Sequence, residues 1–172
     1  DTYLFGGYDT PRQVVRQFLA ARRDRWTDDW EQRSRAAGLD RVSVLALASI
    51  VEAEAFRAEE MPLIAAVYRN RIRIGMPLQA DPTIQYAFLL DRGERVPRML
   101  NRDYAYQSPY NTYLYRGLPP TPIGNPSDAA IEAVLSPADV TYLYFVARGD
   151  GSHRFSTTYQ EHLRTIREIR GP

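Results

Sequence analysis

The feature that most constrains the fold is an apolar run that ends in two acids. Residues 44–51 read "VLALASIV", and Glu52 and Glu54 follow almost directly. Asp40 can cap a helix that begins at the next residue, and apolar side chains then surround its whole circumference. The sequence therefore predicts a central, buried helix over residues 41–56. Because a desolvated carboxylate is costly unless it is paired or neutralised, the two glutamates need an explanation.

The rest of the pattern predicts further helices and one small sheet. Caps, prolines and apolar spacing indicate the helix boundaries. The expected helices run from Pro11 to a stop at Gly38, over about 59–74, from Asp81-Pro82 through Phe88, from Ser127 to about 135, and over about 158–169. Residues 141–156, "TYLYFVARGDGSHRFS", are typical of a β-hairpin with a Gly-Asp-Gly turn. We expect a helix-rich α+β domain with a central buried helix and a small antiparallel hairpin.

Length and composition narrow the class of protein. A chain of 172 residues with a formal charge of +1 is typical of one globular domain and argues against a dedicated nucleic-acid binder. We expect residues 1–172 to form that domain, with 1–38 as a helical amino-terminal portion. The sequence has no cysteine and no metal-ligand spacing, so we expect neither a disulfide nor a metal site. It begins at Asp1 without an initiator Met, as an excised portion of a longer protein would.

The two glutamates allow two interpretations. Residues two positions apart on a helix point about 200° apart around its axis, so Glu52 and Glu54 cannot face one cleft. Both acids can simply pair with arginines near the helix end, such as Arg57, Arg69 or Arg71. Alternatively, one is a general acid whose pKa an apolar wall raises toward roughly 6. Periodicity alone does not choose between the two residues.

Other polar residues fit a carbohydrate site. "LQADPT" supplies Gln79, Asp81 and Thr83, although Asp81 can be a simple helix cap. "PYNTY", residues 109–113, offers an amide, a hydroxyl and rings that can hydrogen-bond and stack on sugars. The two histidines, His153 and His162, have either a structural role or a role in substrate positioning.

Four segments, in this order and spacing, resemble the YceG-like family of bacterial endolytic murein transglycosylases. They are "SIVEAEA", "AAVYRNRIRIGMPLQADPTIQYA", "SPYNTYLYRGLPPTPIGNPS" and "TYLYFVARGDGSHRFSTTYQEH". Two positions depart from the family's pattern: Thr121 stands where glycine is expected and Gly124 where alanine is common. Both lie in the Pro-rich loop, so they bear on its conformation.

The resemblance implies lytic cleavage of the MurNAc-β-1,4-GlcNAc bond of peptidoglycan, with 1,6-anhydro-MurNAc ends and no cofactor. It implies Glu52 as the single general acid/base, buried so that it starts protonated. The residues that match the family's cleft are Gln79, Asp81, Thr83, Tyr110, Asn111, Thr112, Tyr113, His153 and Phe155. Glu54, Glu161 and His162 match as supporting residues.

Two other functions stay open at the level of sequence. One is a lysozyme-like hydrolase that uses Glu52 with Asp81 as the second carboxylate. The other is a non-catalytic glycan-binding module, for instance a scaffold for cell-wall synthesis enzymes.

The resemblance also implies a location. Family members usually begin with a membrane-spanning helix and a LysM-like region, and this chain resembles the part after both. The parent is thus expected at the extracytoplasmic face of the plasma membrane, near peptidoglycan synthases (penicillin-binding proteins), where it cleaves nascent glycan strands. The fragment itself is expected to be soluble, with membrane contact only through the preceding anchor.

Overall fold

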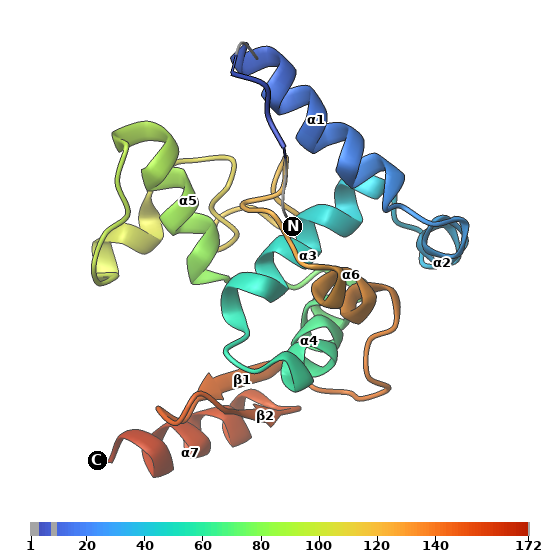
Figure 1. The fold of residues 1–172 in the computed structure, drawn as a ribbon. Helices are drawn as coiled ribbons and strands as arrows, with labels where there is room; N and C mark the ends of the chain where they lie inside the picture. The colour runs from blue at the N-terminus through green and yellow to red at the C-terminus, as the bar shows by residue number, and fades with distance from the viewer. Residues whose placement is uncertain (1–3, 8–9, 172) are drawn as a thin grey trace. The chain divides into compact units, whose positions relative to one another are not determined.

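The chain divides into two compact units. A computed structural model describes residues 4–7 and 10–171, and contacts within it separate residues 1–38 from residues 39–172 (Figure 1).

The first unit holds two helices where the sequence predicted one. Helix α1 spans Pro11–Asp24 and α2 spans Asp28–Ala36, so the single helix expected from Pro11 to Gly38 is wrong. The Thr27 hydroxyl accepts a hydrogen bond from the Trp30 amide at 3.1 Å and starts a new helix. A threonine followed by two aspartates is an N-terminal signal that the continuous amphipathic pattern hid.

The core of the second unit is built around α3, Arg41–Glu54. Val44, Leu47, Ile50 and Val51 are fully buried, which confirms the predicted central helix. Helix α3 contacts α4 (Met61–Arg73), α5 (Asp81–Arg92) and α6 (Asp128–Leu135), and Figure 1 shows it between α5 on one side and α4 with α6 on the other. A helix with partners on several faces needs apolar residues all round.

The segment between α5 and α6 is irregular. It contains one short 3₁₀ helix, η2 (Asn101–Ala105), and a second one, η1 (Ala58–Glu60), precedes α4. Asp81 does not cap α5: Ala80 is the N-cap residue, and Asp81 is the first helical residue. Because the Asp81 carboxylate does not cap the helix, it can interact with another group.

The carboxyl-terminal part forms the predicted hairpin and final helix. Strands β1 (Tyr144–Ala147) and β2 (His153–Ser156) pair antiparallel, with Tyr144 opposite Ser156 and Ala147 opposite His153. Helix α7 (Tyr159–Arg170) packs on both strands and begins with a capping box in which Glu161 accepts the Thr158 amide. The helix-rich α+β class is confirmed.

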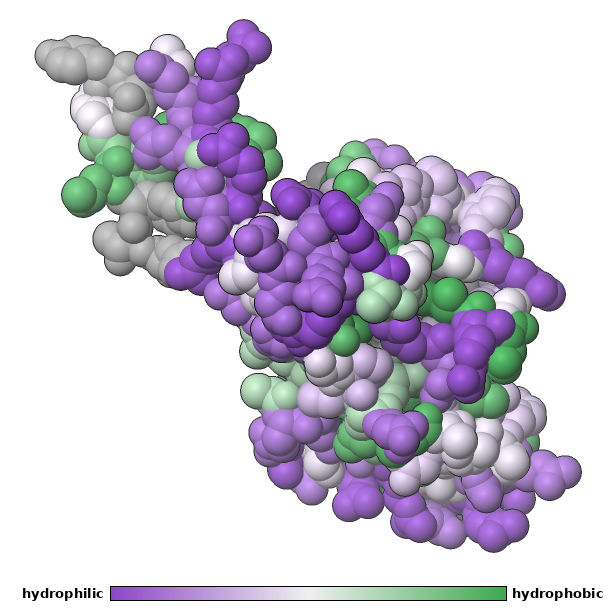
Figure 2. All heavy atoms as spheres, turned by 90° about the vertical axis from the view of Figure 1, so that its right-hand side faces the viewer, coloured by the Kyte–Doolittle hydropathy of each residue, from purple (hydrophilic) through white to green (hydrophobic). Residues whose placement is uncertain are grey.

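Hydrophilic side chains predominate on the face of the molecule in Figure 2, and apolar residues lie between them in separate patches. Among the described residues, no helix has both the length and the apolar character needed to cross a membrane.

Candidate active site

Glu52 and Glu54 line different cavities on different sides of α3, as the helical spacing predicts. Glu52 lines a small cavity of about 120 Å³ together with Ser49 and Ile123. Glu54 lines a larger cavity of about 380 Å³, called the cleft below, between α3, α4, α5, the hairpin and α7. The two carboxylates therefore have separate surroundings and can have separate roles.

Glu52 connects α3 to the start of α6. Its Oε2 accepts hydrogen bonds from the Ser127 amide at 3.0 Å and from the Ser127 hydroxyl at 2.5 Å. The Ser127 hydroxyl is also the N-cap of α6, because it accepts the Ala130 amide at 3.2 Å. A carboxylate at the amino-terminal end of a helix is favoured by the helix dipole. These contacts give Glu52 an anchoring position.

One turn before Glu52, the Pro-rich loop approaches α3 closely. The Ser49 hydroxyl accepts a hydrogen bond from the Ile123 amide at 2.9 Å. The small side chain of Ser49 leaves room for this loop to approach the helix. Thr121 is one of the two residues in this loop that depart from the family's pattern. Its hydroxyl oxygen lies 2.7 Å from the Tyr110 hydroxyl oxygen.

Glu54 has the surroundings of a carboxyl that keeps its proton. The Tyr68 hydroxyl donates to its Oε1 at 2.9 Å. The pKa of Glu54 is raised to about 7: burial is the main cause and the charge of Asp81 adds to it, while the Tyr68 hydrogen bond and the Arg71 charge oppose the rise. Near neutral pH, a large fraction of Glu54 is therefore protonated and able to donate.

The arginines near the helix end do not neutralise either glutamate, so that interpretation is wrong. Arg57 donates to the Asp150 carbonyl, Arg69 to the Val134 carbonyl, and Arg71 to the Leu143 and Leu78 carbonyls at 2.7 and 2.6 Å. Arg71 still lines the cleft and acts on Glu54 through its charge.

Asp81 faces the same cleft as Glu54. The Tyr113 hydroxyl donates to its Oδ1 at 2.6 Å, and the Tyr104 ring lies 4.6 Å from the Tyr113 ring. Burial, followed by the hydrogen bond to Asp81, raises the pKa of Tyr113. Gln79, which also lines the cleft, has a φ of 52° and is the one non-glycine residue with positive φ in the described chain. Such backbone strain is typical of functional sites.

The hairpin and α7 form the opposite wall. His153 lies with its Nδ1 2.7 Å from Glu60 Oε2, and its amide donates to Glu60 Oε1 at 3.0 Å. The His162 ring stacks on Tyr144 with 5.2 Å between centroids. Burial, and then the charges of Arg71 and Arg170, lower the pKa of His162. This wall offers imidazole and phenol groups, which can hydrogen-bond sugar hydroxyls.

The structure brings about half of the predicted site residues to the cleft. Those that line it are Glu54, Gln79, Asp81, Tyr113, His153 and His162. The others have partners within the protein. Thr83 and Thr112 are buried with their hydroxyls 2.9 Å apart, and the buried Asn111 amide donates to the Tyr104 and Tyr106 carbonyls. These residues support the cleft wall from behind.

Three further predicted residues lie in packing or capping contacts. The Phe155 ring stacks on Tyr142 at 5.7 Å, Tyr110 contacts Tyr86 and Thr121, and Glu161 accepts the Thr157 and Thr158 amides. Sequence reasoning also missed cleft residues, namely Tyr68, Arg71, Tyr104, Tyr144 and Tyr159. The three-residue spacing of Tyr68 and Arg71 on α4 was the available signal, because it places both on one helix face.

The structure does not bring together the carboxylate pair proposed for a hydrolase. Glu52 and Asp81 line separate cavities, and Asp81 instead shares the cleft with Glu54. Within residues 4–7 and 10–171, no group of three or more His, Asp or Glu side chains is arranged to hold a metal ion.

The cleft of this helical α+β domain is thus lined by a carboxyl with a raised pKa together with tyrosines, a glutamine and imidazoles. The YceG-like family profile matches residues 1–168, and the chain belongs to this family.

Named relatives agree with this assignment. The endolytic murein transglycosylase of Bacillus subtilis (strain 168) is 34% identical over 161 residues, which are 94% of this chain and 44% of that protein. The endolytic murein transglycosylase of Streptococcus pneumoniae (strain D39) is 31% identical over 169 residues, 97% of this chain and 30% of that protein. The chain thus spans less than half the length of these relatives.

A crystal structure of a putative YceG-like protein from Listeria monocytogenes has the same fold. It superposes with a TM-score of 0.81 and 34% sequence identity, and the match covers 94% of this chain and 51% of that one.

Proposed function

We propose that this chain is the catalytic part of an endolytic murein transglycosylase. It cleaves the MurNAc-β-1,4-GlcNAc bond within peptidoglycan strands without water and forms 1,6-anhydro-MurNAc ends. Family membership supports the reaction class. The feature that carries the mechanism is the Glu54 carboxyl, which lines the cleft, accepts the Tyr68 hydroxyl and has its pKa raised by burial to about 7.

We assign the general acid to Glu54. The resemblance in sequence pointed to Glu52, but the contacts favour its neighbour. Glu52 is engaged by the N-cap residue of α6, whereas Glu54 faces the larger cleft with Gln79, Asp81 and Tyr113. A general acid needs a proton at working pH and a site where substrate can reach it.

The reaction then needs one carboxyl used twice. Glu54 gives its proton to the glycosidic oxygen as the bond to muramyl C1 breaks, and GlcNAc leaves with a free hydroxyl. The muramyl C6 hydroxyl attacks C1, and Glu54, now a carboxylate, takes the hydroxyl proton. Glu54 is protonated again, as at the start, and the strand ends in a 1,6-anhydro-MurNAc residue. Because the nucleophile belongs to the substrate, its effective concentration is high and no activated water is required.

The remaining cleft residues have supporting roles in this proposal. The Tyr68 hydroxyl holds the Glu54 carboxyl in place, and Asp81 raises its pKa while it orients Tyr113. Negative charge on Asp81 also suits the oxocarbenium character that develops at C1. The proposal includes the parent's location at the extracytoplasmic face of the plasma membrane, beside peptidoglycan synthases.

The test is the chemistry of the new strand ends. Uncrosslinked peptidoglycan is incubated with the protein in heavy-oxygen water, and the ends are identified by mass spectrometry. We expect anhydro-muramyl ends without the label, and none with Glu54→Gln. Labelled reducing ends would indicate a hydrolase that uses Glu54 with Asp81. Intact strands that nonetheless bind the protein would indicate a glycan-binding module.

A further inference from the structure

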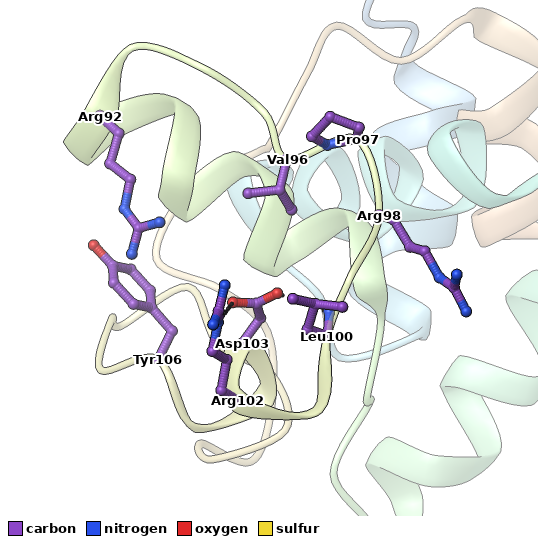
Figure 3. A pocket seen from close by; sticks show the side chains of 8 residues that line it. All are labelled: Arg92, Val96, Pro97, Arg98, Leu100, Arg102, Asp103 and Tyr106. Carbon is purple, nitrogen blue, oxygen red and sulfur yellow. Dashed lines mark hydrogen bonds and ion pairs between the residues drawn. The ribbon is translucent and has the colours of Figure 1, made fainter.

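A third cavity, lined in part by arginines, lies further along α5 and η2 from the cleft. It has a volume of about 420 Å³ and is formed by the end of α5, the following loop and η2; we call it the α5–η2 pocket (Figure 3). Tyr104 of η2 lines the cleft, while the neighbouring Asp103 and Tyr106 line the pocket. Along α5, Asp81 lines the cleft and Arg92 lines the pocket, a helical separation of about 16 Å.

The pocket carries more positive than negative charge. Three arginines line it, Arg92, Arg98 and Arg102, against one acid, Asp103. Asp103 Oδ2 is used within the fold, because it accepts the Leu100 amide at 2.7 Å. The contact from Arg102 Nε to Asp103 Oδ1 is 3.9 Å, too long for a hydrogen bond.

Arg92 is held in place without a carboxylate. Its guanidinium lies 4.2 Å from the Phe88 ring centroid and 4.9 Å from that of Tyr106. The Tyr106 hydroxyl donates to Asp91 at 2.7 Å, which fixes the ring. None of the ion pairs among the described residues involves Arg92. Figure 3 shows the nitrogen ends of Arg92 and Arg102 directed toward the interior of the pocket and Arg98 directed away.

Arg92 also interacts with the Tyr106 hydroxyl, and stacking leaves its other in-plane N–H donors for a ligand. The planar fork matches a carboxylate, and stacking on two rings lowers the entropy lost when the ligand binds. Val96 and Leu100 add apolar surface to the same pocket. A ligand that fits carries a carboxylate next to aliphatic groups.

We propose that the α5–η2 pocket binds a carboxylate of the stem peptide carried by the glycan strand in the cleft. This inference rests on the proposed function, because peptidoglycan carries such a peptide on its muramyl residues. An extended peptide of five residues spans about 16 Å, which equals the separation along α5. The pocket then selects strands whose peptides still have free carboxylates.

Direct binding tests the pocket independently of catalysis. N-acetylmuramyl pentapeptide is titrated calorimetrically into wild type, Arg92→Gln and Arg102→Gln, and compared with the same compound whose carboxyls are amidated. We expect amidation or Arg92→Gln to weaken binding at least tenfold, as for loss of a charge-assisted hydrogen bond. Arg102→Gln should weaken it less. Arg167→Gln, an exposed arginine of α7 outside the described cavities, serves as the control without effect.

Cleavage provides the second readout. Strands with peptides are compared with strands from which an amidase has removed them. The wild-type ratio of kcat/KM on the two substrates should be about ten, and Arg92→Gln should lower it toward one while Arg167→Gln does not.

Equal binding of the acid and amide compounds would overturn the inference, as would tighter binding of inorganic pyrophosphate than of the peptide. Absence of cleavage together with carboxylate-dependent binding would overturn the proposed function and leave the pocket assignment supported.

Discussion

Two glutamates separated by one alanine on the same helix have different chemistry. Glu52 accepts two hydrogen bonds from the N-cap residue of α6 in a cavity of about 120 Å³. Glu54 accepts one from a buried tyrosine and faces a cleft of about 380 Å³ beside a second acid. The difference teaches that the surroundings of a carboxyl, and not its place in a motif, set whether it anchors the fold or donates a proton.

The largest expected effect is on catalytic activity, which should distinguish Glu54 from Glu52. Glu54→Gln removes the only acidic proton of the proposed mechanism, so strand cleavage should fall by about 10³-fold or more. Glu52→Gln keeps a side chain of the same size that can still accept from Ser127, and it should retain activity within about tenfold. Initial rates on uncrosslinked glycan strands measure both. The opposite order would return the general acid to Glu52.

The second effect concerns stability and its pH dependence. The pKa of Glu54 rises from 4.5 to about 7 on folding, so the folded state holds a proton that the unfolded chain releases between these values. Stability should therefore fall as pH rises through that window. Glu54→Gln removes the penalty and should stabilise the protein at pH 8 by on the order of 2–3 kcal/mol.

Urea unfolding at pH 8 and pH 4 measures this penalty. The gain from Glu54→Gln should be present at pH 8 and nearly absent at pH 4. Glu52→Gln, the matched control on the same helix, should show no such gain at pH 8. A gain of equal size for both variants would remove the distinction between the two surroundings.

Asp81→Asn tests the link between the cleft carboxyls. Loss of the Asp81 charge should lower the pKa of Glu54, so the alkaline limb of the pH–rate profile should move to lower pH. A lytic enzyme should lose roughly tenfold or less in kcat/KM at its new optimum, since Asp81 only positions and stabilises. A collapse by several orders of magnitude would indicate a hydrolase in which Asp81 has a chemical role.

The smallest effect is expected on the Glu52 side. Ser127→Ala removes the N-cap of α6 and one of the two donors to Glu52, which should cost about 1–2 kcal/mol in free energy of unfolding. Strand cleavage should stay within a few-fold of wild type. A double-mutant cycle with Glu52→Ala, which removes the acceptor of the Ser127 hydroxyl, should show coupling, because the residues share a hydrogen bond. Additive effects would mean that the bond contributes no stability.

The backbone of the second unit could be predicted because local rules and packing agree there. The Asp40 and Ser127 caps, the apolar circumference of residues 44–51 and the Gly-Asp-Gly turn each specified an element that the structure contains. The predicted helix from Pro11 to Gly38 was wrong, because amphipathic spacing on both sides of Thr27 hid a cap. The proposed division of residues 1–172 as one catalytic domain stays a prediction.

The site could be predicted only in part. Spacing showed that Glu52 and Glu54 face different ways but not which faces a cleft, because that depends on where residues 123 and 144–147 fold back onto α3 and α4. Tyr68 is an ordinary core residue in sequence, and its partner Glu54 lies 14 positions away. The roles of Glu52 and Glu54 remain predictions until activity is measured.

The central claim is that Glu54 holds the proton in the cleft, and a carboxyl titration tests it most directly. Side-chain carboxyl ¹³C shifts of glutamate-labelled protein are followed from pH 3 to 9 in wild type, Glu52→Gln and Glu54→Gln. We predict one glutamate that titrates near pH 7 in wild type and in Glu52→Gln and is absent from Glu54→Gln. A titration near pH 7 that disappears in Glu52→Gln instead, or that no glutamate shows, would contradict the account.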